Sequence, residues 1–292
     1  MHLKYEIQKD DFNKTINEIL INKLSFSNRL ISKLIKNNRI YLNNSTVDTR
    51  IKIDCEGFIV IDFDYIEDNS NIVSTNMSLN IIYEDEWILV VDKPSGIPIH
   101  PSRLHYTDSL SNGIKYYFDK INLKKKIRPI NRLDLNTSGL VVFAKCEYIQ
   151  EQFSNQMANN QFEKEYLCIV DGVLSEKKST IDLPIARKPN SIIERIVDEN
   201  GKKSVTHYTV LKEFDTYSLV NCKLETGRTH QIRIHMNAIG HSILGDTLYG
   251  KKSSLINRQA LHSYKIQCIH PIYKNSLVFV ANLPKDMENL IS

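Results

Sequence analysis

Residues 128–145 read RPINRLDLNTSGLVVFAK, and this stretch decides how the larger part of the chain is expected to fold. A polar loop that contains one carboxylate, Asp134, runs directly into an apolar strand predicted at residues 139–144. The Thr-Ser-Gly turn between them can fix the loop through hydroxyl hydrogen bonds to the backbone. A loop on a rigid strand holds its side chains in place, so Asp134 is a candidate functional group. A structural ion pair between Arg132 and Asp134 would explain the same residues.

Strands predicted on both sides of this loop do not alternate regularly with helices. A single helix, at residues 147–159, is predicted between the strand at residues 139–144 and the strand at residues 164–171. The chain has no βαβ alternation and no GxGxxG, so a parallel dinucleotide-binding sheet is not expected. The pattern favours an α+β fold with a mixed, mainly antiparallel sheet and flanking helices. The further strands are predicted at residues 87–91, 164–171, 204–214, 217–224, 231–235 and 276–281.

The first 63 residues are predicted to form a small α+β domain of their own. Apolar residues at helical spacing predict two short helices, and Ser27 is placed to cap the second. Two strands are expected to follow, joined to the helices by an Asn-Asn turn. The helices are predicted at residues 14–24 and 28–37, and the strands at 46–53 and 57–63.

One face of the second helix is basic. No acidic residue occurs between Glu18 and Asp48, so this face is not neutralised by nearby sequence. Such a face either binds phosphate groups or is a solvated helix surface. Its members are Arg29, Lys33, Lys36 and Arg39.

Charge separates the N-terminal domain from the rest of the chain. The 292 residues carry a net charge of +4, yet residues 61–92 hold eight acids and no Lys or Arg. Residues 64–78 are predicted to be an acidic linker, and residues 79–292 a second, larger domain. Both flanking blocks are mildly basic, which fits a polyanionic partner or simple solubility.

A second motif, GRTHQIRIHM at residues 227–236, contains an arginine that needs a partner. If the segment is a strand, Gln231, Arg233 and His235 share one face. A half-buried Arg233 then requires a carboxylate, because an unpaired buried charge is costly. His230 and His235 lie on opposite faces without an acidic cluster, so no metal site is expected.

A third motif, GHSILGDTLYG at residues 240–250, contains three glycines. Glycines permit tight turns and let a backbone or ligand approach closely. A structural surface loop is an equally good interpretation of this segment.

Together these segments resemble the RluA family of RNA pseudouridine synthases. The family loop HRLDxxTSGLLLxAK corresponds to residues 131–145, where Asn131 replaces the common His. The family strand KxYLAxVxG corresponds to residues 164–172, and the GRTHQIR motif with its GHPIxGDxxYG continuation to residues 227–250. VDKPSGIPIHP and ALHSYKIQCIHP, which start at Val91 and Ala260, match further family segments. The resemblance covers about residues 80–284 and implies the pseudouridine synthase fold.

The resemblance implies that the chain is an isomerase, which converts uridine in RNA to pseudouridine. The essential family aspartate maps onto Asp134, as a nucleophile or base at the ribose or the uracil. A carboxylate in a partly dry pocket needs a cation to stay ionised, and the family arginine maps onto Arg233. The family tyrosine maps onto Tyr166, where a ring can stack on the flipped uracil; a core tyrosine is the alternative.

RNA contacts are implied in both domains. Arg132, beside Asp134, is suited to fill the gap left by the flipped base or to hold phosphate. Arg228 and His230 are also predicted to bind the RNA substrate. The N-terminal domain resembles the S4 RNA-binding domain, with its basic helix face against RNA. That domain is expected to supply affinity, so the chain without residues 1–75 should still isomerise uridine at high RNA concentration. The resemblance also implies a reaction that needs no cofactor and no metal.

Two other functions compete with the enzyme. A non-catalytic RNA-binding or assembly factor on this fold would not need a loop carboxylate in a cleft that holds a polyanion. A small-molecule glycosidase would need a second acid, and the motifs offer only Asp246. We expect ribosomal RNA of the large subunit as the partner, with transfer RNA as the other candidate. The chain shows no apolar run of membrane length, and its five scattered cysteines favour the cytoplasm; a monomer is expected.

Overall fold

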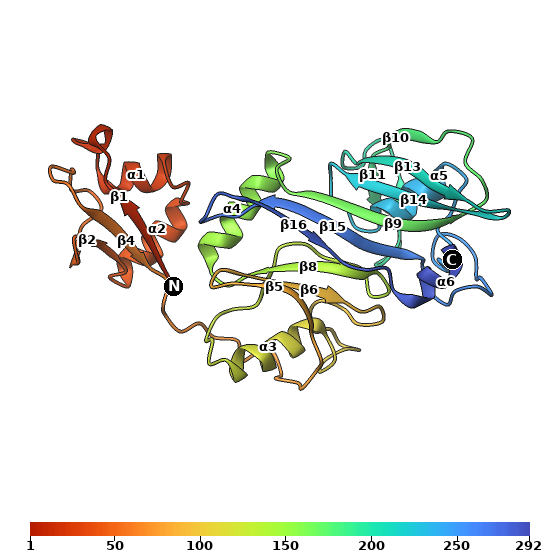
Figure 1. Ribbon diagram of the computed structural model, residues 1–292, viewed down its shortest axis with the longest axis horizontal. Coiled ribbons are helices and arrows are strands. Elements are labelled where there is room, and N and C mark those ends of the chain that lie inside the picture. Colours follow the sequence, from red (N-terminus) through yellow and green to blue (C-terminus); the bar gives the residue numbers. More distant parts are fainter.

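The computed structural model describes all 292 residues as an elongated molecule. Residues 1–63, hereafter the N-terminal unit, lie at one end of the long axis, and the C-terminus lies toward the other (Figure 1). A large sheet runs through the rest of the molecule between these two ends. The molecule therefore consists of two parts placed side by side along one axis.

The N-terminal unit is a four-stranded sheet with two short helices against it. The strand order is β1-β4-β2-β3, with all pairs antiparallel. Thr15 and Ser27 cap the two helices through their hydroxyl groups, as the sequence predicts for Ser27. The elements are β1 (His2–Glu6), a 3₁₀ turn η1 (Lys9–Asp11), α1 (Ile16–Asn22), α2 (Asn28–Lys36), β2 (Ile40–Leu42), β3 (Ser45–Thr46) and β4 (Phe58–Asp62).

The strand predicted at residues 46–53 is wrong. Only Ser45 and Thr46 pair as β3, and a turn at Asp48 and Arg50 follows, where the Arg50 N–H donates to the Asp48 carboxylate at 2.9 Å. An aspartate that bonds the backbone two residues on favours a turn over a continued strand. The first strand, β1, was not predicted, and it adds to the edge of β4.

A ten-stranded sheet forms the body of the molecule. Eight strands follow the order β10-β13-β14-β9-β15-β8-β6-β5, while β16 pairs with β15 and β7 with β8. Every pair is antiparallel except β15 with β8, so the mixed, mainly antiparallel sheet is confirmed. The strands are β5 (Asn80–Glu84), β6 (Ile88–Lys93), β7 (Arg128–Pro129), β8 (Ser138–Ala144), β9 (Glu163–Asp171), β10 (Lys178–Asp182), β13 (Val205–Glu213), β14 (Tyr217–Leu224), β15 (Leu261–Ile269) and β16 (Ser276–Val280).

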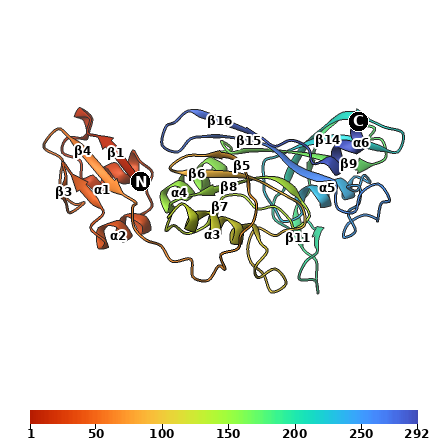
Figure 2. The ribbon, with the colours of Figure 1, turned by 60° about the horizontal axis from the view of Figure 1, so that its bottom comes forward.

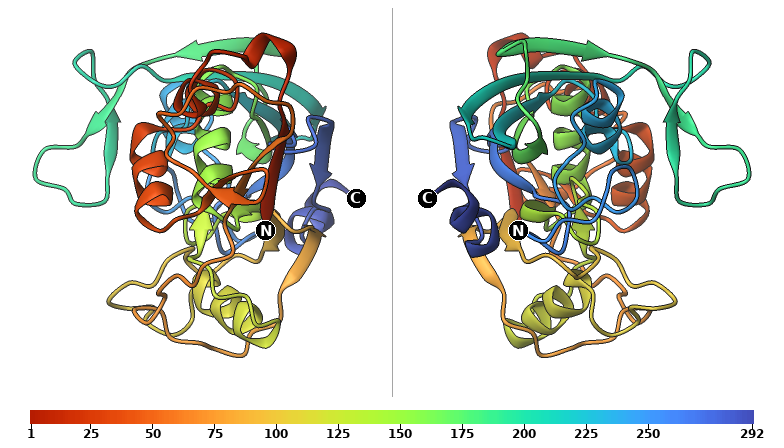
Figure 3. Two further views of the ribbon diagram at one scale, coloured as in Figure 1. Left: turned by 90° about the vertical axis from the view of Figure 1, so that its left-hand side faces the viewer. Right: turned by 90° about the vertical axis from the view of Figure 1, so that its right-hand side faces the viewer.

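Four helices and one hairpin accompany this sheet. Helix α3 packs on β6 and β8, α4 faces the N-terminal unit, and α5 lies near β13 at the far end (Figures 1 and 2). The hairpin of β11 and β12 projects from one side (Figure 3). The elements are α3 (Leu110–Lys120), α4 (Glu147–Ala158), β11 (Ile185–Arg187), β12 (Arg195–Val197), α5 (Gln231–Ala238) and α6 (Lys285–Ile291). None of the helices combines the length and apolar composition that a membrane crossing requires.

The strand predicted at residues 231–235 is wrong, because this segment is the helix α5. Residues 231 to 236 are all buried, so this helix has no solvent-exposed polar face. Its polar and apolar residues therefore do not follow the helical period in the sequence. The helix starts where His230 takes a left-handed backbone with φ of 60°. The Gln231 side chain stabilises the preceding turn by accepting the Arg228 N–H at 3.0 Å and the Thr226 hydroxyl at 2.8 Å.

The N-terminal unit and the large sheet share one apolar core. A single cluster of buried side chains runs from Leu3 and Phe63 to Trp87 and residues of β8, β15 and β16. Phe26 of the unit stacks on Tyr148 of α4 with ring centroids 4.3 Å apart. Burial of a large apolar side chain contributes about 1.5–3 kcal/mol, so this contact is a substantial part of the fold. Removing residues 1–75 would expose Trp87 and Tyr148, and the truncated chain is therefore expected to be unstable rather than merely weaker in RNA binding.

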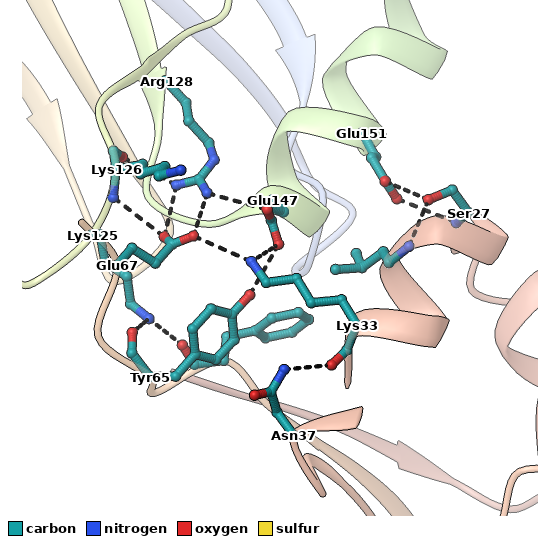
Figure 4. Close-up of polar contacts among 12 residues, drawn as sticks. Ser27, Lys33, Asn37, Tyr65, Glu67, Lys125, Lys126, Arg128, Glu147 and Glu151 are labelled. Carbon is teal, nitrogen blue, oxygen red and sulfur yellow. Dashed lines mark hydrogen bonds and ion pairs between the residues drawn. The ribbon is translucent and has the colours of Figure 1, made fainter. Parts of the chain in front are cut away.

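The acidic segment after the unit is docked on the body of the molecule. Residues 64–78 contain no helix or strand, as predicted for a linker. Glu67, however, has only 4% of its side chain exposed and forms a bidentate ion pair with Arg128 at 2.5 and 2.9 Å (Figure 4). Lys33 of α2 reaches Glu147 of α4 at 2.7 Å and Glu67 at 3.6 Å. The network thus combines a buried pair, Glu67 with Arg128, and a partly exposed pair, Lys33 with Glu147, and the second pair joins the unit to α4.

Removal of the Glu67 charge should destabilise the whole chain. Glu67→Gln leaves the buried Arg128 without its bidentate partner, which costs about 3 kcal/mol. Urea unfolding should therefore show a lower midpoint for this variant. The matched control is Glu56→Gln, because Glu56 is exposed and forms no ion pair. Equal midpoints for the two variants would mean that the network does not hold the unit.

Candidate active site

The loop that contains Asp134 is anchored to β8 by the Asn131 side chain, and β8 in turn lies close against β15. The Asn131 amide donates to the Leu140 carbonyl and accepts the Val142 N–H, both at 2.9 Å. Gly139 has φ of 110°, and a Cβ there would lie 2.3 Å from the Ser263 carbonyl oxygen of β15. Only glycine permits the close approach of β8 to β15 at this point. Asn131, which stands where the family has His, thus acts as a structural anchor.

Two buried basic side chains, Lys93 and Arg258, donate hydrogen bonds to backbone carbonyls of the same loop. Lys93 is fully buried, and its ammonium donates to the carbonyls of Pro94, Ile97 and Leu135 at 2.8, 2.9 and 3.1 Å. Burial lowers the pKa of Lys93 to about 7, and the nearby Asp134 carboxylate opposes this effect. Arg258 donates to the Asn136 carbonyl at 3.2 Å. These contacts hold the backbone of the two residues that follow Asp134 and so restrict where its carboxylate can lie.

Arg233 bridges two carboxylates. Its Nη1 donates to Asp134 at 3.0 Å, which brings together two residues that lie 99 positions apart in the sequence. Its Nε and Nη2 form a bidentate pair with Asp246 at 2.7 and 2.8 Å. Burial alone would raise the pKa of Asp246, but the Arg233 guanidinium outweighs it and holds this pKa below its ordinary value. Asp246 is 1% exposed and Asp134 25%, so Asp246 fixes the arginine and Asp134 faces the open space.

His230 and Tyr249 complete the surroundings of Asp134. The His230 Nδ1 lies 2.8 Å from the Tyr249 hydroxyl, and its Nε2 lies 3.7 Å from Asp134. Burial lowers the pKa of His230, which favours a neutral imidazole near neutral pH. The Arg233 guanidinium lies 5.1 Å from the Tyr249 ring centre, within cation–π range. Tyr249 therefore supports both side chains that contact Asp134.

Asp134 opens onto a cleft of about 1600 Å³, hereafter the active-site cleft. Tyr166 of β9 lines both this cleft and the deeper recess that contains Asp134 and Arg233. Burial raises the pKa of Tyr166 to about 12, so its hydroxyl stays protonated at physiological pH. Arg132, Arg228 and His230 also line the cleft. Three further acids line the cleft, Glu163, Glu165 and Glu225, and each pairs with a lysine or histidine within 3 Å. Asp134 is the acid that also lines the recess, where it meets the Tyr166 ring and several cations.

The four residues of the basic helix face do not act as one surface. Arg39 pairs with Asp62, and Lys33 pairs with Glu147 at 2.7 Å, so both are neutralised within the protein. Arg29 and Lys36 are exposed and form no ion pair. The four-cation surface expected from the sequence is therefore reduced to two free cations.

Sequence reasoning missed three residues of the site: Asp246, Tyr249 and Lys93. Asp246 and Tyr249 both lie in the GHSILGDTLYG motif, which could be interpreted from the sequence as a structural surface loop. Asp246 is the only acid of this motif and could have been proposed as the partner of Arg233, because a buried arginine needs a carboxylate. His235, which was weighed with His230 as a metal ligand, is buried against Thr206 and Leu183. The structure shows no group of three His, Cys, Asp or Glu side chains arranged to hold a metal ion.

Comparison with known families gives a match to RNA pseudouridylate synthase over residues 87–238. This range includes Asp134, Tyr166 and Arg233. It covers about half of the chain, from the start of β6 to the end of α5.

Individual relatives extend the similarity to almost the whole chain. An uncharacterised RNA pseudouridine synthase of Bacillus subtilis is 35% identical over 92% of this chain and 95% of its own length. Ribosomal large subunit pseudouridine synthase D of Pasteurella multocida is 32% identical over 99% of this chain and 94% of its own. The structure of human RNA pseudouridylate synthase domain containing 1 superposes with a TM-score of 0.58 at 25% identity, over 73% of this chain and 93% of its own.

Proposed function

This chain belongs to the RNA pseudouridine synthase family, and we propose that it isomerises uridines of large-subunit ribosomal RNA with Asp134 as its catalytic carboxylate. It is an isomerase that acts on RNA. The observation that supports the catalytic role is the Arg233 bridge, which presents one partly exposed carboxylate in a recess that contains no other acid and is lined by cations, apolar side chains and the Tyr166 ring. A protein that only binds RNA has no use for a carboxylate aimed at a polyanion.

Asp134 acts at the reacting nucleotide, either on the ribose or on the uracil ring. The N1–C1′ bond breaks, the uracil turns, and its C5 bonds to C1′; the C5 proton then leaves and N1 takes up a proton. Arg233 stabilises the ionised carboxylate and orients it, since its other two nitrogens are held by Asp246. The target base must leave its stack to reach this recess, which costs a few kcal/mol.

Tyr166 and Arg132 are proposed to hold the flipped nucleotide. The Tyr166 ring, at the wall of the recess, is placed to stack on the uracil, and its protonated hydroxyl is available for proton transfer in the C5 step. Arg132 is exposed beside Asp134, where it can fill the vacated stack or bind phosphate. Arg228 and His230 border the same cleft as further RNA contacts.

Tyr166→Phe tests the hydroxyl separately from the ring. We expect single-turnover isomerisation to slow by about 10²-fold or more, because a positioned proton-transfer group typically contributes that much. RNA binding should stay near wild type, since the ring remains. Tyr208→Phe is the control, because this buried tyrosine lies outside the cleft and the recess. An unaltered single-turnover rate would limit Tyr166 to stacking.

The N-terminal unit is proposed to be an S4-like RNA-binding domain. Two helices against a small sheet, with exposed Arg29 and Lys36 on the second helix, support this assignment. An enzyme of ribosomal RNA is expected in the cytoplasm, where its substrate is made, and all five cysteines are free thiols. We expect it to act as a monomer.

The substrate assignment is tested by mapping pseudouridines in cells. Chemical mapping of large-subunit ribosomal RNA from a strain without this gene should lack specific pseudouridines that the wild-type strain contains. The wild-type gene should restore them. If large-subunit ribosomal RNA is unchanged and transfer RNA loses a pseudouridine, the substrate assignment is wrong and transfer RNA is the substrate.

A further inference from the structure

A second cavity of about 800 Å³ lies where the N-terminal unit meets α4, and we call it the junction groove. Its walls come from α2, from α4 and from the segment that precedes β7. The groove combines exposed cations with neutral polar side chains. These include Arg29, Lys126, Gln150, Ser154 and Asn155.

The free charge in the junction groove is positive. Arg29 and Lys126 are exposed and form no ion pair within the protein. The groove also contains two acids, but Glu147 is neutralised by Lys33 at 2.7 Å. Glu151 keeps its negative charge and accepts hydrogen bonds from the Ser27 hydroxyl and N–H (Figure 4), so three cations and two acids line the groove and its net charge is +1. Two free cations from different elements, α2 and the segment before β7, suit an anionic chain that binds in the groove.

Helix α4 connects the junction groove to the active-site cleft. Gln150 and Ser154 line the groove, whereas Met157 and Ala158, at the end of the same helix, line the cleft. Gln150, Ser154 and Ala158 are all exposed, and their four-residue spacing places them on one stripe of the helix. No charged residue occurs from residue 152 to residue 162, so this stripe presents no charge that repels phosphate.

The dimensions match a short piece of RNA. Eight residues of helix separate Gln150 from Ala158, which corresponds to about 12 Å. At a stacked rise of about 3.4 Å per nucleotide, this distance takes three to four nucleotides. The contacts of Lys33 with Glu147 and of Ser27 with Glu151 hold α2, and with it Arg29, in place beside α4.

We propose that the substrate RNA runs along α4 from the active-site cleft to the junction groove, where Arg29 and Lys126 bind its phosphates. This proposal rests on the proposed function, because it takes RNA as the substrate in the cleft. The body of the molecule thus contributes one of the two phosphate contacts in the groove, and α2 contributes the other. The arrangement places the phosphate site three to four nucleotides beyond the edge of the cleft, on the side of α4.

The first test removes the two cations. In filter binding to transcribed large-subunit ribosomal RNA, Arg29→Ala combined with Lys126→Ala should weaken affinity about 30-fold at 0.1 M salt and reduce the log–log salt slope by about 1.5. The matched control is Lys52→Ala combined with Lys120→Ala, because both lysines are exposed, unpaired and outside the groove and the cleft. The control should keep affinity and turnover near wild type. Equal effects of the two double variants would overturn the proposal.

The second test adds a charge to the path. Ser154→Glu places a carboxylate on the stripe and should weaken RNA binding about sixfold at 0.1 M salt, as if one phosphate contact were lost. Ser78→Glu is the control, since Ser78 is exposed and lies outside both cavities. Unchanged binding of Ser154→Glu would overturn the path along α4 and leave the groove free for a protein partner. Failure of the proposed function is distinct, because then the wild-type chain forms no pseudouridine.

Discussion

Asp134→Asn should abolish pseudouridine formation while the protein stays folded and binds RNA. The amide keeps the shape of the side chain and can still accept the Arg233 hydrogen bond, but it lacks the charge and the nucleophilic oxygen. We expect the single-turnover rate to fall by about 10⁴-fold or more, as for other essential catalytic groups. The rate is measured by nucleoside mass spectrometry of ribosomal RNA transcripts incubated with excess enzyme.

Asp54→Asn is the matched control for this substitution. Asp54 is exposed and unpaired in the N-terminal unit, so its variant should turn over RNA like wild type. Residual isomerisation by Asp134→Asn within tenfold of wild type would remove Asp134 from the chemistry.

Arg233→Ala should lose both activity and stability. It leaves the nearly inaccessible Asp246 without its bidentate partner, and breaking a buried pair on one side costs about 3–5 kcal/mol. Asp134 loses its orienting hydrogen bond in the same variant. Arg233→Lys keeps the charge, but one ammonium cannot reproduce the planar fork that contacts both acids. We therefore expect the lysine variant to be more stable than the alanine variant in urea unfolding and still strongly impaired in turnover.

Double-mutant cycles separate the two partners of Arg233. Asp246→Ala combined with Arg233→Ala should recover a large part of the stability that Arg233→Ala loses, because it removes the stranded buried acid. Asp134→Ala combined with Arg233→Ala should recover less, since Asp134 is partly exposed and can be solvated. Strictly additive losses in both cycles would mean that Arg233 pairs with neither acid.

Most of the candidate site was predictable, because the resemblance to a known family named Asp134 and Arg233 and the arginine itself demands a carboxylate. A buried arginine needs a carboxylate, and the structure places Asp134 at 3.0 Å from Arg233. The strand at Ser138–Ala144 was also found, because a continuous apolar run after a turn marks a central strand. Helix α3 was missed although Leu110, Ile114 and Phe118 follow a four-residue spacing after Ser109. The capping serine and the apolar spacing of this segment are both visible in the sequence and predict a helix there.

Other features were beyond sequence reasoning for physical reasons. Helix α5 is buried on all sides at residues 231 to 236, so its period does not appear in the sequence. The pairing of Lys33 with Glu147 joins residues 114 positions apart, and no local pattern marks it. A basic helix face in sequence is therefore not yet a phosphate site, because tertiary contacts decide which of its charges remain free.

The most direct test of the account is release of tritium from C5 of uridine. Large-subunit ribosomal RNA transcribed with [5-³H]uridine is incubated with the purified wild-type chain, with no added cofactor or metal, and with the Asp134→Asn variant in parallel. Formation of the C5–C1′ bond releases the label, so the account predicts tritium in the solvent for wild type and none above background for Asp134→Asn. Equal release from both proteins would contradict it, as would an inactive wild-type chain that binds the same RNA.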